Sequence, residues 1–322
     1  MLAAYAARTD PDDPLSALEV GDVPAPEPRD GWVPVHVRAA TLNHHDLWSL
    51  RGVGLPADRL PMILGCDAAG VTEDGREVLV HAVVGGRHAP AGQAVAPDEP
   101  RSILSERYAG TLAELVQVPA TNLVDKPEAL TWEQAACLPT AYLTAYRALF
   151  RSGQAQPGQR VLVQGAGGGV ATAAVLLGAA AGLDVTVTSR DAAKRERALA
   201  LGAVSAVETG ARIPRVDLVL ESVGAATWQH SMRSVKDGGT VVVVGATTGD
   251  PAPMGVTHVF FREVTVTGAT MGTRDELHQL AVYVAQRGVE PLVDSSYALK
   301  DAREAFARLA AGGHMGKIAV VP

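Results

Sequence analysis

The chain has 322 residues, enough for about two domains, and its 28 lysines and arginines against 35 aspartates and glutamates give a net charge of −7. Hydrophobic residues make up 47% of the chain and charged residues 20%, which excludes disorder as its main state. This mildly acidic balance argues against a nucleic-acid or anionic-membrane partner. The two cysteines cannot build a disulfide framework or a four-cysteine zinc site.

We expect neither a secretory nor a membrane-spanning segment in this sequence. The first eight residues do not lead a basic stretch into a long apolar core, so we expect no signal peptide. No run of 18 apolar residues occurs, so we expect no transmembrane helix. We therefore expect a cytoplasmic protein that has no membrane partner.

The first 125 residues are predicted to form a β-rich module. Val33, Val35 and Val37 alternate with Pro34, His36 and Arg38, as in a half-buried strand, and residues 111–119 alternate again. Proline and glycine recur through residues 24–100 and mark turns and loops. The pattern favours a compact β-barrel or sandwich with loop insertions.

The pattern changes after residue 125. A capping box at 131–134 predicts a helix that includes Cys137 and that Pro139 would end or kink. Apolar strands then alternate with helices, as in a parallel sheet that is covered on both faces. The predicted strands are 160–164, 184–188, 216–220, 240–244 and 264–267. A final amphipathic helix at 302–309 precedes a strand at 317–321, which could return to either module.

A glycine-rich turn follows the first of these strands. Gly165 and Gly167, with Gly168 and Gly169, precede a helix, as in a dinucleotide-binding turn, although Val170 stands where a third glycine is expected. Glycines let the backbone approach a pyrophosphate at the positive end of a helix. The alternative is a tight turn in an unrelated α/β protein.

The end of the second strand predicts which dinucleotide is bound. An NAD site places a carboxylate there for the ribose hydroxyls, but this chain has Ser189 and Arg190, followed by Lys194 and Arg195. A hydroxyl and several cations suit a 2′-phosphate. We therefore predict NADPH/NADP as the cofactor, with a solvated helix start as the alternative reading of these charges.

The order of the motifs resembles the medium-chain dehydrogenase/reductase superfamily, and within it the quinone oxidoreductase and zinc-free enone reductase branch. The matching segments are 43–48, 64–70, 138–146, the glycine turn, 221–224 and 316–317. The resemblance implies an α/β protein with a GroES-like β-barrel catalytic domain (1–125 and 291–322) and a Rossmann NADP(H)-binding domain with a doubly wound parallel sheet (126–290).

The resemblance also implies roles for individual residues. Asn43 would lie beside the nicotinamide and donate to a substrate carbonyl, and Asp46 would orient its loop or serve only as a turn partner. Residues 51–55 lack the tyrosine that some enoyl reductases have there, so Tyr142 or solvent would have to supply the proton. Trp48 and Cys66 would line the substrate pocket. The remaining cofactor contacts would come from Thr144, the glycine turn with Val170, and Ser189, Arg190 and Lys194, and from Ser222, Val223, Gly245, Ala246, Thr270, Met271 and Lys317.

A zinc site is the main alternative. The zinc alcohol dehydrogenases of the superfamily place ligands where this chain has Asn43, Cys66, Asp67 and, approximately, Cys137. Asn is a poor zinc ligand, so we expect no metal, although Cys66, Asp67 and Cys137 could form a degenerate site.

A site without zinc favours reduction of an activated C=C bond, because the resulting enolate spreads its charge and hydrogen-bond donors alone can stabilise it. We therefore expect an NADPH-dependent, zinc-independent reductase of enones, enals or quinones that acts on a small carbonyl or quinone substrate. By analogy with relatives it would be a homodimer, paired through the strand at 264–267. The alternatives are a zinc-dependent alcohol dehydrogenase and a nucleotide-binding homologue that performs no catalysis.

Overall fold

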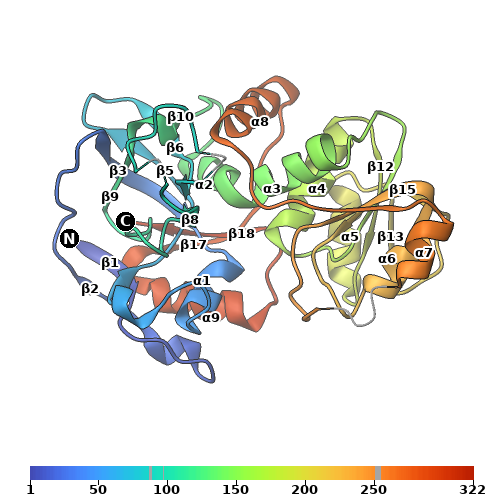
Figure 1. Ribbon diagram of the computed structural model, residues 1–322, viewed down its shortest axis with the longest axis horizontal. Coiled ribbons are helices and arrows are strands. Elements are labelled where there is room, and N and C mark those ends of the chain that lie inside the picture. Colours follow the sequence, from blue (N-terminus) through green and yellow to red (C-terminus); the bar gives the residue numbers. More distant parts are fainter. Residues whose placement is uncertain (87–88, 97, 251–254) are drawn as a thin grey trace. The chain divides into compact units, whose positions relative to one another are not determined.

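The computed structural model describes residues 1–86, 89–96, 98–250 and 255–322, and the chain divides into two compact units (Figure 1). The first contains 1–140, 273–286 and 290–322, and the second contains 141–272 and 287–289. No helix in the described part of the chain is both long enough and apolar enough to cross a membrane.

The first unit is built mainly from antiparallel strands. A seven-stranded sheet has the order β10-β6-β5-β3-β18-β17, with β9 also paired to β3, and β2-β1-β4 and β7-β8 form two smaller sheets. The main sheet contains β3 (Trp32–Thr41), β5 (Ala68–Thr72), β6 (Glu77–Val80), β9 (Leu115–Pro119), β10 (Leu123–Asp125), β17 (Val293–Ala298) and β18 (Lys317–Val321). The smaller sheets contain β1 (Leu2–Ala6), β2 (Leu18–Asp22), β4 (Met62–Ile63), β7 (Val83–Val84) and β8 (Ser102–Ile103).

The last strand of the chain settles an alternative that the sequence left open. The predicted strand at 317–321 is β18, and it lies between β17 and β3 in the first unit. Its antiparallel register pairs Ala319 with Thr41. Two residues before Ala319 on β18, the same antiparallel register brings Lys317 opposite Asn43, which is two residues after Thr41. The two residues are 274 positions apart in the sequence.

The α-helices described in this unit are α1 (His44–Leu50), α2 (Trp132–Ala136), α8 (Arg274–Arg287) and α9 (Ala302–Ala311). The predicted capping box of α2 is present, with Thr131 and Gln134 bonded reciprocally. Because α2 packs on β3 and β5, the first unit extends to Thr140 rather than to residue 125. Most of α8 also belongs to this unit, where the predicted division assigned it to the nucleotide-binding domain.

The second unit is a six-stranded parallel sheet in the order β13-β12-β11-β14-β15-β16. Numbered from β11, this is the 3-2-1-4-5-6 order of a dinucleotide-binding fold. Consecutive residues of β11 point to opposite faces of the sheet, and Val161, Leu162 and Val163 are all fully buried, so both faces are covered. The strands are β11 (Arg160–Val163), β12 (Asp184–Thr188), β13 (Ser205–Val207), β14 (Val216–Glu221), β15 (Val235–Val243) and β16 (Thr265–Gly268). The helices are α3 (Leu143–Tyr146), α4 (Gly169–Ala180), α5 (Ala192–Ala200), α6 (Trp228–Ser234) and α7 (Val256–Phe261). The predicted α/β fold class is confirmed.

Candidate active site

Asn43 lies at the junction between β3 and α1. It is the residue before the first helical position, and its backbone N–H donates to the Asp46 carboxylate at 2.7 Å. The other oxygen of Asp46 accepts from the N–H of Gly65 at 3.0 Å. Asp46 is fully buried, which raises the pKa of its carboxyl above the ordinary value. Asp46 therefore holds two backbone segments together, and this geometry fits the predicted orienting role rather than contact with a substrate.

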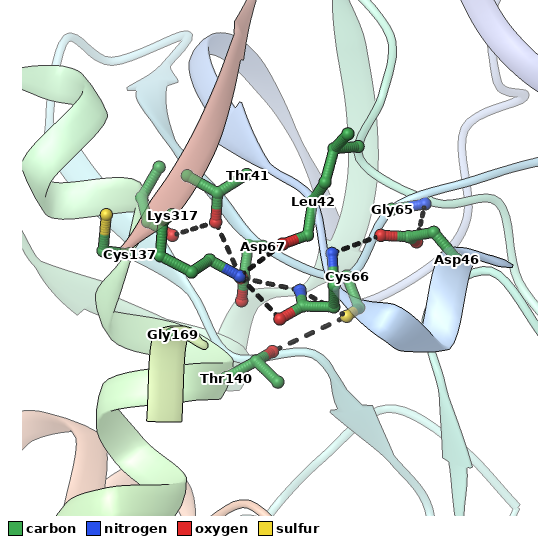
Figure 2. Close-up of polar contacts among 12 residues, drawn as sticks. Thr41, Leu42, Asp46, Gly65, Cys66, Asp67, Cys137, Thr140, Gly169 and Lys317 are labelled. Carbon is green, nitrogen blue, oxygen red and sulfur yellow. Dashed lines mark hydrogen bonds and ion pairs between the residues drawn. The ribbon is translucent and has the colours of Figure 1, made fainter. Parts of the chain in front are cut away.

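Four side chains, Thr41, Asn43, Asp67 and Lys317, are linked by polar contacts and form what we call the amide cluster. Figure 2 labels Thr41, Asp67 and Lys317 of this cluster. Asp67 is completely buried, and its Oδ2 accepts from the Thr41 hydroxyl and the Asn43 amide, each at 2.8 Å. The same oxygen forms an ion pair with the Lys317 ammonium at 3.0 Å. Asp67 Oδ1 is buried and has no hydrogen-bond partner among the described residues. The three other side chains of the cluster therefore all contact one carboxylate oxygen.

The Lys317 side chain is 3% exposed. Its ammonium donates to the Leu42 carbonyl and to Asn43 Oδ1, each at 2.6 Å, and forms the ion pair with Asp67. The structure thus gives Lys317 a place in the amide cluster, and its role in binding the cofactor stays a prediction.

The two cysteines are not arranged as zinc ligands. Cys66 Sγ lies 3.4 Å from the Asn43 Nδ2 and 3.6 Å from the Thr140 hydroxyl, whereas Cys137 Sγ donates to the Glu133 carbonyl of its own helix at 3.2 Å and points away from Cys66 (Figure 2). Burial raises the pKa of both thiols, which opposes the thiolate form that binds zinc.

The other potential ligands fit zinc no better. Asn43 is a poor zinc ligand, and the ammonium of Lys317 already lies against the Asp67 carboxylate. Across the described residues, no group of three His, Cys, Asp or Glu side chains is placed to hold a metal ion. The donor set of the amide cluster therefore does not suit zinc.

Three further residues were predicted to contact the substrate or the cofactor, and they differ in how deeply they are buried. Trp48 lies half-buried on α1, and Thr144 is buried on α3. The Tyr142 side chain is fully buried, so this structure does not support its predicted role as a proton donor to a substrate.

In the second unit, the predicted glycine turn joins β11 to α4. Gly165 has φ +84°, a conformation that favours glycine, and its N–H donates to the Thr188 hydroxyl at 3.2 Å. Gly168 caps the N-terminus of the twelve-residue helix α4, and a Cβ at this position would meet nothing within 4 Å. Gly167, Gly169 and Val170 complete the turn and the first helical positions. Open space beside a helix N-terminus suits a pyrophosphate.

The end of β12 carries the predicted cationic residues. Ser189 is half-buried and Arg190 is exposed, while Lys194 lies in the first turn of α5. Asp191, the one carboxylate in this segment, is engaged in capping α5 through the N–H groups of Ala193 and Lys194. Asp191 thus has a structural role as the cap of α5, and the position directly after β12 carries Ser189 and Arg190 instead of a carboxylate.

A buried polar network in the second unit was not predicted from the sequence. The fully buried Glu221 carboxylate accepts from the N–H groups of Val223 and Gly224 and from the hydroxyls of Thr227 and Ser231, at 2.6–3.0 Å. The sequence signals were an acidic residue directly after an apolar strand and its place in the matching segment 221–224. The network fixes the turn that contains the predicted cofactor residues Ser222 and Val223.

A further part of the network continues to the glycine turn. The Gln164 amide donates to Ser231 Oγ at 2.9 Å, and its oxygen accepts from the Thr188 hydroxyl at 2.7 Å. Thr188 in turn accepts from the Gly165 N–H.

The other predicted cofactor residues lie after the ends of two further strands. Gly245 and Ala246 follow β15, and Thr270 and Met271 follow β16. The residues predicted in this unit, apart from the buried Thr144, thus follow the carboxyl ends of parallel strands, where open α/β sheets bind ligands.

Comparisons with known proteins match both units. The family model of the alcohol dehydrogenase GroES-like domain matches residues 29–128, and that of the zinc-binding dehydrogenases matches residues 166–320. A crystal structure titled NAD-dependent alcohol dehydrogenase is 30% identical, with a TM-score of 0.89 and coverage of 100% of both chains.

The names of two curated relatives contain a coenzyme A thioester and the word reductase. The acryloyl-coenzyme A reductase of Sulfurisphaera tokodaii is 26% identical over 96% of this chain and 98% of the relative. The crotonyl-CoA carboxylase/reductase of Cereibacter sphaeroides is 25% identical over 96% of this chain and 84% of the relative. With a GroES-like β domain, a 3-2-1-4-5-6 parallel sheet and these matches over the full chain, the protein belongs to the medium-chain dehydrogenase/reductase superfamily of oxidoreductases.

Proposed function

We propose that this protein is an NADPH-dependent, zinc-independent reductase of activated C=C bonds in enones and enals, or of quinones. The observation that carries the proposal is the amide cluster, in which a neutral amide and a lysine ammonium surround Asp67 where zinc enzymes of the superfamily place metal ligands. The two relatives named for reductases of unsaturated acyl-CoA thioesters support reduction of a conjugated C=C bond.

The chemistry of the acceptor explains why a site without metal suits this reaction. When a hydride forms a C–H bond at the β-carbon of an enone, the π electrons move onto the carbonyl oxygen and give an enolate. That charge is shared between oxygen and the α-carbon, so a hydrogen-bond donor can stabilise it without a Lewis acid. Asn43 offers such a donor, and a proton from solvent then completes the α-carbon.

The proposed cofactor is NADPH, which when bound supplies the hydride from its nicotinamide. The glycine turn before α4 would hold the pyrophosphate, and Ser189, Arg190 and Lys194 would hold the 2′-phosphate. Support comes from the exposed guanidinium of Arg190 and from the engagement of Asp191 in capping α5. These residues fit a phosphate better than a pair of ribose hydroxyls.

Steady-state assays with NADPH and NADH against enones, enals, quinones and simple alcohols test the proposal. We expect reduction of the conjugated acceptors, with NADPH preferred. Oxidation of simple alcohols by protein that retains near-stoichiometric zinc after purification without chelator would instead establish an alcohol dehydrogenase. Tight NADPH binding with no hydride transfer to any acceptor would establish a nucleotide-binding homologue that performs no catalysis.

We also propose that the protein is a homodimer paired through β16. This strand is at the edge of the parallel sheet, so one side of its backbone is open to pairing. The preceding helix α7 exposes Phe260 and Phe261, at 62% and 75%. Light scattering should give twice the chain mass of 33.4 kDa, and Phe260→Glu with Phe261→Glu should shift it toward one chain. A wild-type mass of a single chain would contradict this pairing.

A further inference from the structure

Lys317 fixes the orientation of the Asn43 amide. Its ammonium donates to Asn43 Oδ1 at 2.6 Å, and an ammonium can only donate, so the oxygen of the amide must face Lys317. The Nδ2 group consequently faces Asp67 Oδ2 at 2.8 Å and Cys66 Sγ at 3.4 Å. Lys317 and Asp67 therefore hold the two ends of the amide in one orientation.

The two N–H bonds of the Asn43 amide point at acceptors of different strength. One is held by a carboxylate, which is a strong acceptor, and the other points at a sulfur, which is a weak one. Burial raises the pKa of the Cys66 thiol well above its ordinary value, so the sulfur carries no negative charge that would strengthen the contact. The hydrogen directed at Cys66 is therefore the one that an incoming substrate oxygen can take over.

The cation also changes the strength of this donor. A hydrogen bond from an ammonium to the amide oxygen draws electron density from the nitrogen, and bonded groups in a low-dielectric site polarise one another. Lys317 is 3% exposed and Asp67 is fully buried, so water screens little of this effect. The Asn43 N–H becomes a better donor to a negatively charged oxygen.

We propose that Lys317 is a positioning residue that orients and polarises the Asn43 amide, so that a fixed ammonium, acting through one amide group, stabilises negative charge on the substrate oxygen. This inference rests on the proposed reductase function and adds to it the residue that supplies the positive charge. Asp67 balances that charge and keeps Lys317 in place, and it would not touch the substrate.

The experiment compares wild-type protein with Lys317→Met, the double variant Lys317→Met with Asp67→Asn, and Lys300→Met as an exposed control in the same unit. Lys317→Met should lower kcat about 10- to 100-fold with little change in KM for the acceptor, because the lost interaction strengthens only in the transition state. The double variant removes both buried charges, so it should recover thermal stability without recovering kcat. Lys300→Met should match wild type.

Two readouts separate polarisation from a structural role. In an Asn43→Leu background, Lys317→Met should change kcat little further, because its effect passes through the amide. Across aryl enones with different substituents, Lys317→Met should make kcat more sensitive to electron-withdrawing groups, which take over part of the stabilisation of the enolate.

The outcomes distinguish this inference from the proposed function. A stable double variant with wild-type kcat, an equal loss in the Asn43→Leu background, or an unchanged substituent dependence would each overturn the role of Lys317 while the reductase function stands. Folded wild-type protein that transfers no hydride from NADPH to any acceptor would instead overturn the proposed function, and the inference with it.

Discussion

The ammonium of Lys317 lies 3.0 Å from the carboxylate of Asp67, with 3% of the lysine side chain and none of the aspartate side chain exposed. The register of β18 against β3 produces this pair, because the pairing of Ala319 with Thr41 brings the start of β18 to the segment that follows β3. The C-terminal strand therefore supplies the positive charge of a site whose other members lie within the first 70 residues.

The buried ion pair makes a first prediction about stability. Lys317→Met leaves the Asp67 charge without its cation, and breaking such a pair costs about 3–5 kcal/mol of unfolding free energy. Adding Asp67→Asn should restore most of that loss, since no uncompensated charge remains. Urea unfolding curves of the single variant, the double variant and Lys300→Met provide the measurement. A single variant as stable as Lys300→Met would show that the pair does not stabilise the fold.

A second prediction concerns cofactor choice. Arg190→Ala should raise the KM for NADPH about 10- to 100-fold, because it removes a charge-assisted hydrogen bond worth about 1.5–3 kcal/mol, and it should leave the KM for NADH nearly unchanged. Arg197→Ala, an exposed arginine further along α5, is the matched control. Equal effects on the two cofactors would contradict a 2′-phosphate contact.

The Glu221 network gives a third prediction. Glu221→Gln replaces one acceptor oxygen by an NH₂ group, so at least one of the bonds to Thr227 or Ser231 must be lost or reversed. We expect a loss of about 1–3 kcal/mol in unfolding free energy. The KM for NADPH should also rise, because the turn at Val223 and Gly224 loses part of its anchor. Glu196→Gln on the exposed face of α5 is the control, and its unfolding curve should match that of wild type.

Asp294 gives a fourth prediction, on pH dependence. Burial alone would raise the pKa of this carboxyl, but the Met315 N–H, the Ser295 hydroxyl and the Arg308 guanidinium hold it below its ordinary value. A lowered pKa in the folded state means that Asp294 stabilises the protein above the unfolded pKa of about 3.9 and stops doing so as pH falls through the folded value.

Asp294→Asn should therefore cost about 1.5–3 kcal/mol at pH 7, and the difference from wild type should begin to shrink at about pH 5 and continue to shrink as pH falls below about 3.9. Thermal unfolding across that range measures it. Exposed Asp58→Asn should show no such convergence. A gap between wild type and Asp294→Asn that is constant with pH would mean that the carboxylate charge contributes nothing.

Local patterns in the sequence were sufficient for most of the fold. The apolar strands at 184–188 and 317–321 match β12 and β18 in both bounds, because their residues fit a buried sheet whatever lies beside them. The strand at 240–244 is the second half of a longer β15, which begins at Val235, because the polar residues from Lys236 to Gly239 hid its start.

The sequence by itself determined the two-module α/β architecture, the glycine turn before a helix and the cationic strand end, because each depends on residues that are neighbours along the chain. The resemblance also showed Asn43 and Asp67 at positions where zinc enzymes of the superfamily place ligands. Only the tertiary structure decided that Lys317 joins them, and that Glu221 anchors a turn through Thr227 and Ser231. Contacts across 274 residues, like that between Lys317 and Asn43, depend on which strands pair and in which register, and the pairing is chosen by burial of the whole sheet rather than by any local pattern.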